Sequence, residues 1–374
     1  MNDTRTPGAT ANPAPLRFEP HYEAPEKDEA QTTADMNETF RKIQQKVFED
    51  TGHAYRGVHA KSHGILRGEL HVAPNLSPLL AQGIFARCRT YPVVMRLSTV
   101  PGDILDDAIS TPRAVALKII GVEGARLPSS ENDVTQDFIL INGPAFGTPT
   151  AHAFAKNLKL VAATTDKAPG LKKVISAVFR GAEKLSEALG HESSTLLSLG
   201  GHPETHPLGD TYYSQTPFLY GDYAVKFSLA PVSPRLIALR KAPVDLKGKP
   251  NGLRDALLTH FATSGGDWEL RVQFCTDLQT MPIEDASKVW SEEVSPFIAV
   301  ARVRVDPQTA WSTERSAAVD DGMAFNPWHG LAAHRPLGSV NRVRKVVYET
   351  AARFRAERDR VSLVEPRTLD NFPK

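Results

Sequence analysis

Hydrophobic residues gather in eight short segments of the chain, and several of these alternate apolar with polar positions. Such alternation is typical of half-buried antiparallel strands. Turns rich in glycine and proline separate many of the segments. Because eight antiparallel strands suffice to close a barrel without exposed edges, the pattern predicts an antiparallel eight-stranded β-barrel. The segments are residues 65–72, 91–100, 113–120, 136–142, 211–220, 223–232, 268–276 and 297–305.

A second pattern, with apolar residues at helical spacing, occupies the rest of the chain. It predicts a first helix over 36–52 that ends at Gly52, a helical insertion at about 150–200 and a C-terminal helix at about 338–360. A further helix is predicted to begin near Asn251. These elements define an α+β fold. We expect residues 1–35 to form a flexible N-terminal arm or a wrapping segment and residues 36–374 a single domain, with the barrel at about 55–305.

Composition excludes several classes of protein. The 374 residues include 44 Lys and Arg against 43 Asp and Glu, so the net charge of +1 argues against a surface devoted to nucleic acid or membrane. No segment approaches the roughly 18 apolar residues of a membrane span, and the N-terminus lacks the apolar core of a signal peptide. Cys88 and Cys275 are isolated, which predicts no disulfide framework. A cytoplasmic location without membrane insertion is therefore expected.

The stretch YRGVHAKSHG, residues 55–64, precedes the first predicted strand and contains two histidines. His59 and His63 have the i, i+4 spacing that metal sites use on helices. Here, however, glycines indicate a loop that leads into a strand, and no acidic residue or HExxH pattern accompanies them. Ordinary structural histidines are thus the simpler interpretation, and a zinc site is not predicted.

Other polar residues stand out within or beside the predicted strands. Arg96 and Ser98 lie two apart, so they share one strand face. That face is either the barrel interior, where both side chains need partners, or the solvent side. Asn132 and Asp133 precede the fourth strand. Packing in the core is the simple account of the nearby Phe138 and Phe146, which flank the strand.

The C-terminal helix, SVNRVRKVVYETAARFRAERD, carries one tyrosine among many arginines. Arg344, Tyr348 and Arg355 share one helix face. A neighbouring cation favours the phenolate form of a tyrosine, and tyrosine is one of the few axial ligands of haem iron. Arginines on the same face are suited to pair with haem propionates. By composition alone, a basic and solvated helix is the favoured explanation of the stretch.

Taken in order, these segments resemble the haem catalase superfamily over roughly residues 50–356. The resemblance rests on RGVHAKSHG, VVMRLSTVPGD, TPRAVALKI, QDFILINGPAF and MAFNPWHGLAAHRPLGSVNRVRKVVY. It implies a catalase-like barrel with helical insertions and a C-terminal proximal haem helix. It also implies haem b as the cofactor.

Carried over by position, the resemblance assigns roles to individual residues. Tyr348 becomes the iron ligand, which Arg344 holds as phenolate. His59 becomes the distal acid and base, and Ser98 its hydrogen-bond partner. The remaining expected haem contacts are Arg56, Arg96 and Arg355 at the propionates, and Val58, Phe138 and Phe146 along the pocket.

This sequence departs from the family pattern at the distal asparagine. Without gaps that asparagine falls on Asp133, with Asn132 one residue away, and the sequence leaves open which of them faces the haem. The resemblance is to small catalase-related proteins, which act on hydrogen peroxide or on organic and lipid hydroperoxides.

We therefore expect a peroxidase or catalase that uses a peroxide with a small-molecule reductant, assembled as a homodimer or homotetramer. A fatty-acid hydroperoxide-converting enzyme and a non-catalytic haem-binding protein are the alternatives. A nucleic-acid binder is disfavoured by the charge balance.

Overall fold

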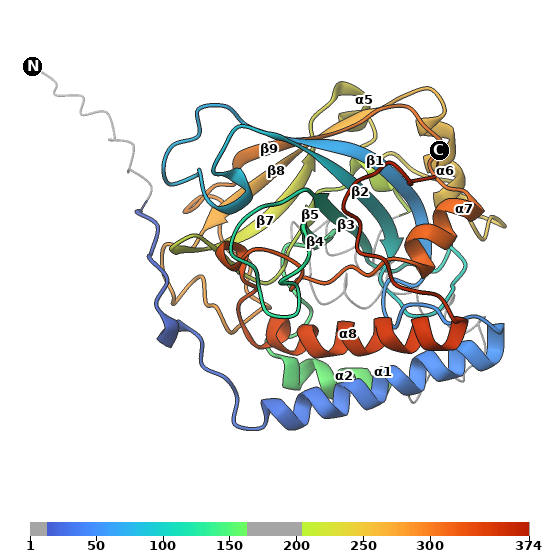
Figure 1. Cartoon of the computed structure of the whole chain (residues 1–374), viewed down its shortest axis with the longest axis horizontal. Coiled ribbons are helices and arrows are strands. Elements are labelled where there is room, and N and C mark those ends of the chain that lie inside the picture. The colour runs from blue at the N-terminus through green and yellow to red at the C-terminus, as the bar shows by residue number, and fades with distance from the viewer. Residues whose placement is uncertain (1–12, 163–203, 374) are drawn as a thin grey trace, which may run out of the picture.

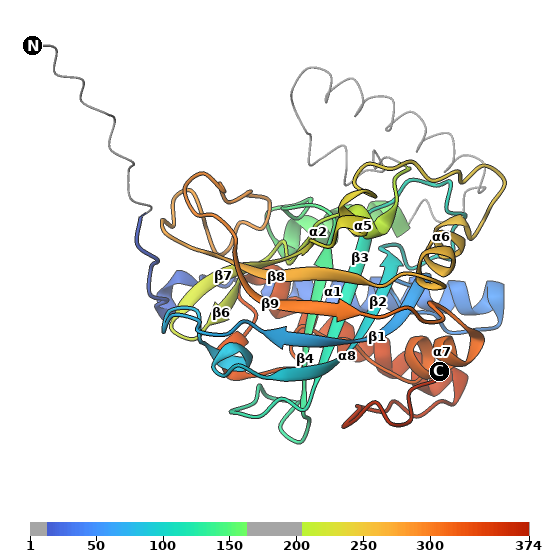
Figure 2. The same ribbon diagram turned by 90° about the horizontal axis from the view of Figure 1, so that it is seen from above.

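A closed antiparallel barrel forms the centre of the computed structural model, which describes residues 13–162 and 204–373 (Figures 1 and 2). The sheet order is β5-β4-β3-β2-β1-β9-β8-β7-β6, and a further β5–β7 pairing closes eight of these strands into a ring. The predicted eight-stranded barrel is thereby confirmed. The strands are β1 Ser62–Val72, β2 Thr90–Thr99, β3 Arg113–Ile120, β4 Thr135–Ile141, β5 Tyr212–Tyr213, β6 Phe218–Tyr220, β7 Tyr223–Pro231, β8 Gly266–Phe274 and β9 Ile298–Val305.

The fifth predicted strand, 211–220, is broken into β5 and β6. Gln215 lies between them with a φ of +60°, outside the extended region. Pro217 follows, and proline has no N–H for a strand ladder. The Gln215 side chain donates to the carbonyl oxygens of Gly143 and Ala145, at 3.1 and 2.7 Å, and so holds the break against the loop after β4.

Alternation along the strands sorts side chains between the barrel core and its outer wall. On β2, Met95 and Leu97 belong to the apolar cluster inside the barrel. Arg96 and Ser98 therefore lie on the outer wall, yet both are buried. Neither alternative derived from the sequence was correct, because further chain covers this face from outside.

The helix α8 Ser339–Asp359 lies beside the outer wall of the barrel, and α1 Glu29–Thr51 and α2 Ala151–Ala162 pack against α8 (Figure 1). The predicted C-terminal helix at 338–360 is thus confirmed. Gly52, with a φ of +72°, ends α1 as predicted, but α1 begins at Glu29 rather than at Met36. The second helix expected in the insertion, at 171–190, lies outside the described residues.

The shorter helices lie before, between and after the strands. They are η1 Pro20–Tyr22, η2 Gly83–Phe85, η3 Pro207–Gly209, α5 Pro234–Ile237, α6 Gly252–Phe261, α7 Thr313–Ser316, the π-helical turn η4 Ala317–Asp321 and η5 Ala332–His334. Among the helices described, none combines the length and apolar character that a bilayer crossing requires.

Residues 13–28, part of the segment expected to form a flexible arm or to wrap the protein, lie against its body. The Leu16 N–H donates to the Cys275 carbonyl at 2.9 Å, and the Phe18 N–H to that of Asp222 at 2.7 Å. Farther along, the Glu23 carboxylate accepts from Arg335 at 2.7 Å. The two backbone hydrogen bonds satisfy polar groups of this segment in the way that strand pairing does. Together with the ion pair, they hold the segment against the body of the protein.

A cluster of carboxylates anchors the start of α8. Arg342 forms ion pairs with Glu23, Glu29 and Glu284, at 2.8, 2.7 and 2.8 Å. Glu23 and Glu284 also accept the backbone N–H groups of Gly338 and Ser339, at 3.0 and 2.8 Å. Negative charge at a helix N-terminus is favourable because the first N–H groups have no partners within the helix. The position of α8 against the barrel is fixed from this end.

Candidate functional site

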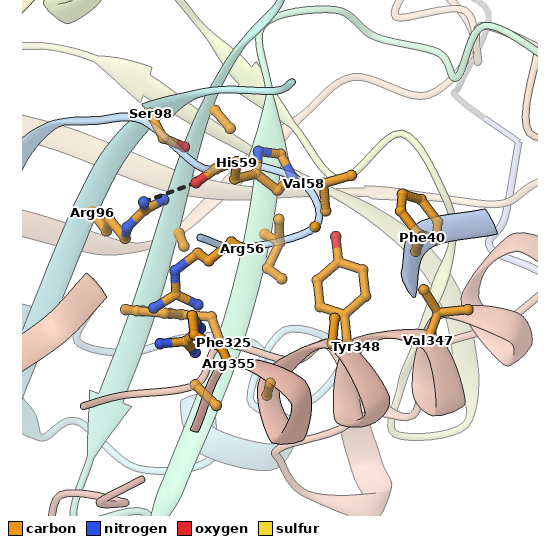
Figure 3. Close-up of a pocket in the computed structure, with 17 residues that line it drawn as sticks. Phe40, Arg56, Val58, His59, Arg96, Ser98, Phe325, Val347, Tyr348 and Arg355 are labelled. Atoms are coloured by element: carbon orange, nitrogen blue, oxygen red, sulfur yellow. Dashed lines mark hydrogen bonds between the residues drawn. The ribbon is translucent and has the colours of Figure 1, made fainter. Parts of the chain in front are cut away.

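A cavity of about 620 Å³ separates α8 from the barrel, and Tyr348 and His59 both line it. Tyr348 points from the middle of α8 toward the loop that carries Val58 and His59, just before β1 (Figure 3). Phe40 of α1 forms part of the same wall. Two sequence-predicted residues that are 289 positions apart are therefore brought to one space.

The barrel side of this space is an outer face with small side chains. Ser98, Ala114, Ala116 and Ile139 of β2, β3 and β4 line a pocket together with His59 and Tyr348. Their strand neighbours Leu97, Val115 and Leu140 point into the barrel core. Because successive strand residues face opposite sides, alanines at two alternate positions of β3 leave room above the sheet for a flat group.

His59 is held in a backbone conformation that side chains rarely adopt. Its φ is +56°, in the left-handed region. Its N–H donates to the Val100 carbonyl at 2.7 Å, and its carbonyl accepts from Arg96 at 2.8 Å. Gly102 allows the segment after β2 to lie close to the loop that carries His59, since a Cβ at this position would lie 2.3 Å from the Gly57 carbonyl oxygen. Strain of this kind persists only where surrounding contacts impose it.

The imidazole of His59 is buried, and its Nδ1 has no hydrogen-bond partner. The predicted hydrogen bond from Ser98 is thus absent, although Ser98 lines the same pocket. Burial lowers the pKa of His59 well below the usual 6.5, and the positive charges of Arg96, Arg344 and Arg56 lower it further. The imidazole is consequently neutral at physiological pH and able to accept a proton.

Arg344 lies one turn before Tyr348 on α8 and contacts its phenol. Arg344 Nη2 is 3.4 Å from the phenol oxygen, and Nη1 donates to Asn341 Oδ1 at 3.3 Å. Asn341 is itself buried, and its amide donates to the carbonyls of Pro217 and Leu337. Asn341 therefore orients the guanidinium of Arg344. The contact between Arg344 and Tyr348 agrees with their i, i+4 spacing, which predicted a shared helix face.

The three arginines predicted to contact haem carboxylates do converge at one end of the pocket (Figure 3). Arg56 donates to the carbonyls of Val319 and Met323, both at 2.7 Å. Arg355 donates to the carbonyls of Asp320, Asp321 and Met323. The Nε atoms of Arg56 and Arg355 are nevertheless buried and without partners, a cost that an anionic ligand would relieve.

Arg96 differs from Arg56 and Arg355, because a carboxylate already neutralises its positive charge. That carboxylate is Asp320, which was not predicted from the sequence. Asp320 accepts from Arg96 Nε at 2.6 Å and from the hydroxyls of Ser62 and Ser316 at 2.6 and 2.7 Å. Burial opposes the charge of Asp320, but these partners and Arg56 hold its pKa below the usual value. The only sequence signal was an acidic pair after a short helix.

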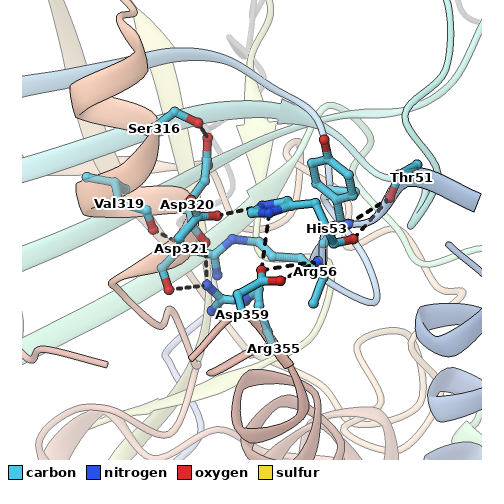
Figure 4. A network of polar contacts seen from close by, with 12 residues as sticks. Thr51, His53, Arg56, Ser316, Val319, Asp320, Asp321, Arg355 and Asp359 are labelled. Atoms are coloured by element: carbon cyan, nitrogen blue, oxygen red, sulfur yellow. Dashed lines mark hydrogen bonds and ion pairs between the residues drawn. The ribbon is translucent and has the colours of Figure 1, made fainter. Parts of the chain in front are cut away.

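A histidine bridge flanks this cluster (Figure 4). His53 Nε2 lies 3.0 Å from Asp321 Oδ1, and His53 Nδ1 lies 3.3 Å from Asp359 Oδ2. Asp359 also accepts the Ala54 N–H. Since both ring nitrogens already face carboxylates, the arrangement links the end of α8 to the loop before β1.

The predicted pocket-lining residues divide into two groups. Val58 and Phe146 line the 620 Å³ cavity, where Phe146 lies 5.1 Å from the Phe154 ring. Phe138 does not line it: its ring lies inside the barrel, 4.6 Å from that of Phe227. The prediction for Phe138 was wrong because its neighbour Ile139 is the residue of β4 that faces the pocket.

Neither candidate for the distal amide lies in the cavity with His59. Asn132 is exposed, and its carbonyl accepts from Arg367 at 2.9 Å. Asp133 lines a neighbouring cavity of about 640 Å³ that includes Tyr348 but not His59. Both expectations are corrected, because the turn before β4 carries these residues away from the distal side.

Sequence reasoning missed several apolar residues of the pocket. On α8, Val347, Ala351 and Ala352 line it beside Tyr348. The helical spacing around Tyr348 was a usable signal for these three. Phe40 and Phe325 come from distant elements, and no local pattern identified them. Arg353 and Arg358 of α8, and Arg360 directly after it, are exposed.

Comparisons with known proteins establish the fold. No protein-family model and no curated protein matches the sequence. Solved structures do match: a bacterial catalase with a TM-score of 0.57 at 15% identity, and catalase A from Saccharomyces cerevisiae with the same values. A fungal catalase matches with a TM-score of 0.56 at 17% identity.

The matches cover 83%, 93% and 98% of this chain respectively. In turn, the chain spans 59% of the bacterial catalase, 68% of the yeast protein and 75% of the fungal one. The chain has the catalase fold.

Proposed function

We propose that this protein binds haem b between α8 and the barrel and uses it to cleave peroxides, with Tyr348 as the iron ligand and His59 as the acid and base. One observation carries the proposal: Tyr348 and a neutral His59 line the same cavity, and Arg344 contacts the phenol oxygen. Catalases with solved structures have the same fold, which supports this assignment.

The chemistry of the donor set fits haem. A phenol oxygen is a known axial ligand of ferric iron, and the wall above it is largely apolar. At the other end, the partnerless Nε atoms of Arg56 and Arg355 offer buried donors for propionates. Arg96 contributes by orienting the His59 loop, since Asp320 takes its charge. The cavity also has the size usual for small-molecule sites.

When bound, haem supplies the redox-active iron. The chain supplies proton transfer and charge stabilisation. His59, neutral and buried, takes the proton of the peroxide and returns it to the leaving oxygen, so that the O–O bond breaks heterolytically. Arg344 stabilises negative charge on the Tyr348 oxygen. Apolar walls around His59 exclude water that would compete for the proton.

The substrate preference follows from the lining of the cavity. Around His59 it is formed largely by apolar side chains, among them Val100, Pro101, Phe146 and Leu158. Apolar side chains of this kind favour the organic portion of a hydroperoxide, whereas hydrogen peroxide has no apolar part to bury. Organic or lipid hydroperoxides, reduced with the help of a small-molecule reductant, are therefore the proposed substrates beside hydrogen peroxide.

The ultraviolet–visible spectrum of the purified protein tests the proposal. We expect a Soret band with ferric phenolate features that Tyr348→Phe abolishes and Tyr223→Phe, on β7, retains. Peroxide consumption is then compared between hydrogen peroxide and cumene hydroperoxide, and the organic peroxide is expected to give the higher kcat/KM. A colourless protein that takes up no added haem contradicts the proposal. Rapid oxygen release from hydrogen peroxide with little reaction of cumene hydroperoxide contradicts the substrate preference.

A further inference from the structure

Tyr348 also forms part of the wall of the second cavity, of about 640 Å³. This space shares Ala324, Phe325, Tyr348 and Ala352 with the pocket described above between His59 and the outer face of β2, β3 and β4. It does not include His59. Its outer side is formed by residues 361–365, which follow α8. A molecule in this cavity is thus close to Tyr348 without occupying the peroxide side.

Asn326 gives this cavity a polar group that lacks a partner. The side chain is 2% exposed and lines the cavity, and its Oδ1 accepts the Trp328 N–H at 3.0 Å. Its Nδ2 is buried and has no hydrogen-bond partner. A buried donor left unpaired costs roughly 1–3 kcal/mol, so an oxygen that reaches Asn326 from the cavity would gain a hydrogen bond from this amide.

The other polar residues of the wall restrict the charge of that molecule. They are Asp133, His329, Glu349, Arg353, Ser362 and Glu365. Lys118 pairs with Glu365, so two carboxylates and one guanidinium remain, and their net negative charge disfavours a ligand with several negative charges. Carboxylates and the histidine also provide acceptors for a hydroxyl hydrogen.

The rest of the wall suits an aromatic ring. Ala324, Phe325, Val361, Leu363 and Val364 contribute apolar surface. A phenol matches both the apolar and the polar part of this wall. Its ring contacts the apolar residues, and its oxygen accepts a hydrogen bond from Asn326. Its hydroxyl hydrogen is donated to a neighbouring acceptor. An uncharged phenol is therefore the ligand that this wall fits.

We propose that the cavity beside Asn326 binds the reductant of the peroxide reaction, an uncharged phenol. The inference rests on the proposed function. The reaction balances as ROOH + 2 ArOH → ROH + H₂O + 2 ArO•. Each phenol loses one electron and one proton, and the two electrons and two protons reduce the O–O bond to an alcohol and water. Peroxide and reductant then approach Tyr348 through different cavities.

The test uses the full-length, haem-loaded protein with guaiacol as the phenol and ABTS, a dianion, as the contrasting donor. Asn326→Asp keeps the oxygen that Trp328 contacts but removes the free donor. Ala356→Trp fills part of the cavity wall from α8. Val346→Trp, exposed on the same helix, is the matched control.

Both cavity variants are expected to raise the KM for guaiacol roughly tenfold, the factor that about 1.4 kcal/mol of lost binding produces. The Soret absorbance and the single-turnover reaction with cumene hydroperoxide should stay within about twofold of wild type. Saturation-transfer NMR of guaiacol, recorded without peroxide, should show binding to wild type and Val346→Trp and weaker binding to the two variants. Wild type should oxidise guaiacol with a higher kcat/KM than ABTS.

An unchanged guaiacol KM in both variants, or equal NMR binding in all proteins, overturns the reductant site. Equal kcat/KM for ABTS and guaiacol overturns its selectivity for uncharged phenols. A wild-type protein without a Soret band or without reaction with peroxide refutes the proposed function instead, and the NMR signal then still reports whether a phenol occupies the cavity.

Discussion

Arg344 Nη2 lies 3.4 Å from the phenol oxygen of Tyr348, and the guanidinium carbon is 5.5 Å from the centre of the ring. The pair is one turn apart on a helix whose start is held by Arg342 and its three carboxylates. Asn341 orients the guanidinium from the preceding turn. The tyrosine oxygen thus has a fixed cation at its side, independent of any ligand.

Arg344→Leu is expected to slow peroxide consumption roughly tenfold, because a hydrogen bond from a charged donor contributes about 1.5–3 kcal/mol. A shift of the ferric phenolate absorption should accompany the loss. Arg358→Leu, exposed on the same helix, serves as control. A variant with wild-type rate and spectrum would show that the guanidinium does not act on the phenol.

His59→Gln should lower the rate of the peroxide reaction by roughly 10² to 10⁴, the usual contribution of a positioned acid and base. Haem content should not change. Because the pKa of His59 lies well below 6.5, the wild-type rate should stay constant as the pH falls from 8 to about 6. Stopped-flow measurements across this range check both points. A titration centred near 6.5 would be the contrary result.

The Arg96–Asp320 pair should be essential for stability, because both partners are largely buried. Asp320→Asn leaves a buried guanidinium without its counter-charge, which costs roughly 3–5 kcal/mol. The exposed pair Arg304–Asp306 is a matched comparison, where Asp306→Asn should cost less than about 1 kcal/mol. Urea unfolding of both variants measures the difference, and similar losses would contradict the assignment.

His334 should make the protein sensitive to acid. Burial lowers its pKa from 6.5 to about 4, and its Nε2 accepts the Ile84 N–H. The neutral form is therefore required in the fold. The contribution of the neutral form of His334 to the free energy of unfolding is complete above pH 6.5. It is lost as the pH falls toward 4, by roughly 3 kcal/mol in total. Urea unfolding between pH 7.5 and 4.5 should show this decline, and His334→Gln should flatten it. An equal slope in the variant would assign the acid sensitivity to other groups.

The barrel was predictable because alternation encodes which strand faces are buried. Alternation predicted a strand correctly where the two faces of that strand differ in polarity. In β8, for example, exposure alternates over most of the strand. The alternation failed at 211–220, since a single residue with positive φ, Gln215, interrupts the strand. For the N-terminal segment, the alternation does not identify the contacts, because partners such as Leu16 and Cys275 are far apart in sequence.

Within the candidate site, helical spacing and a contiguous motif singled out Tyr348, Arg344 and the His59 loop, which the structure brings to one cavity. Phe138 was misplaced because β4 is buried on both faces, so polarity does not tell its two sides apart. A shift of one residue exchanges the faces of a strand. Asp320 was missed because its role depends on Arg96, more than 200 positions away.

The three carboxylates on Arg342 have a consequence for synthesis of the chain. Glu23 and Glu29 leave the ribosome early, whereas Arg342 and the rest of α8 emerge only after the whole barrel. Domains fold as their chain becomes available, and contacts of long sequence separation form late. The barrel strands are complete by Val305, before α8 is made. The cavity therefore lacks the wall that α8 provides until this helix has been synthesised, and a ligand can be enclosed between helix and barrel only after that step.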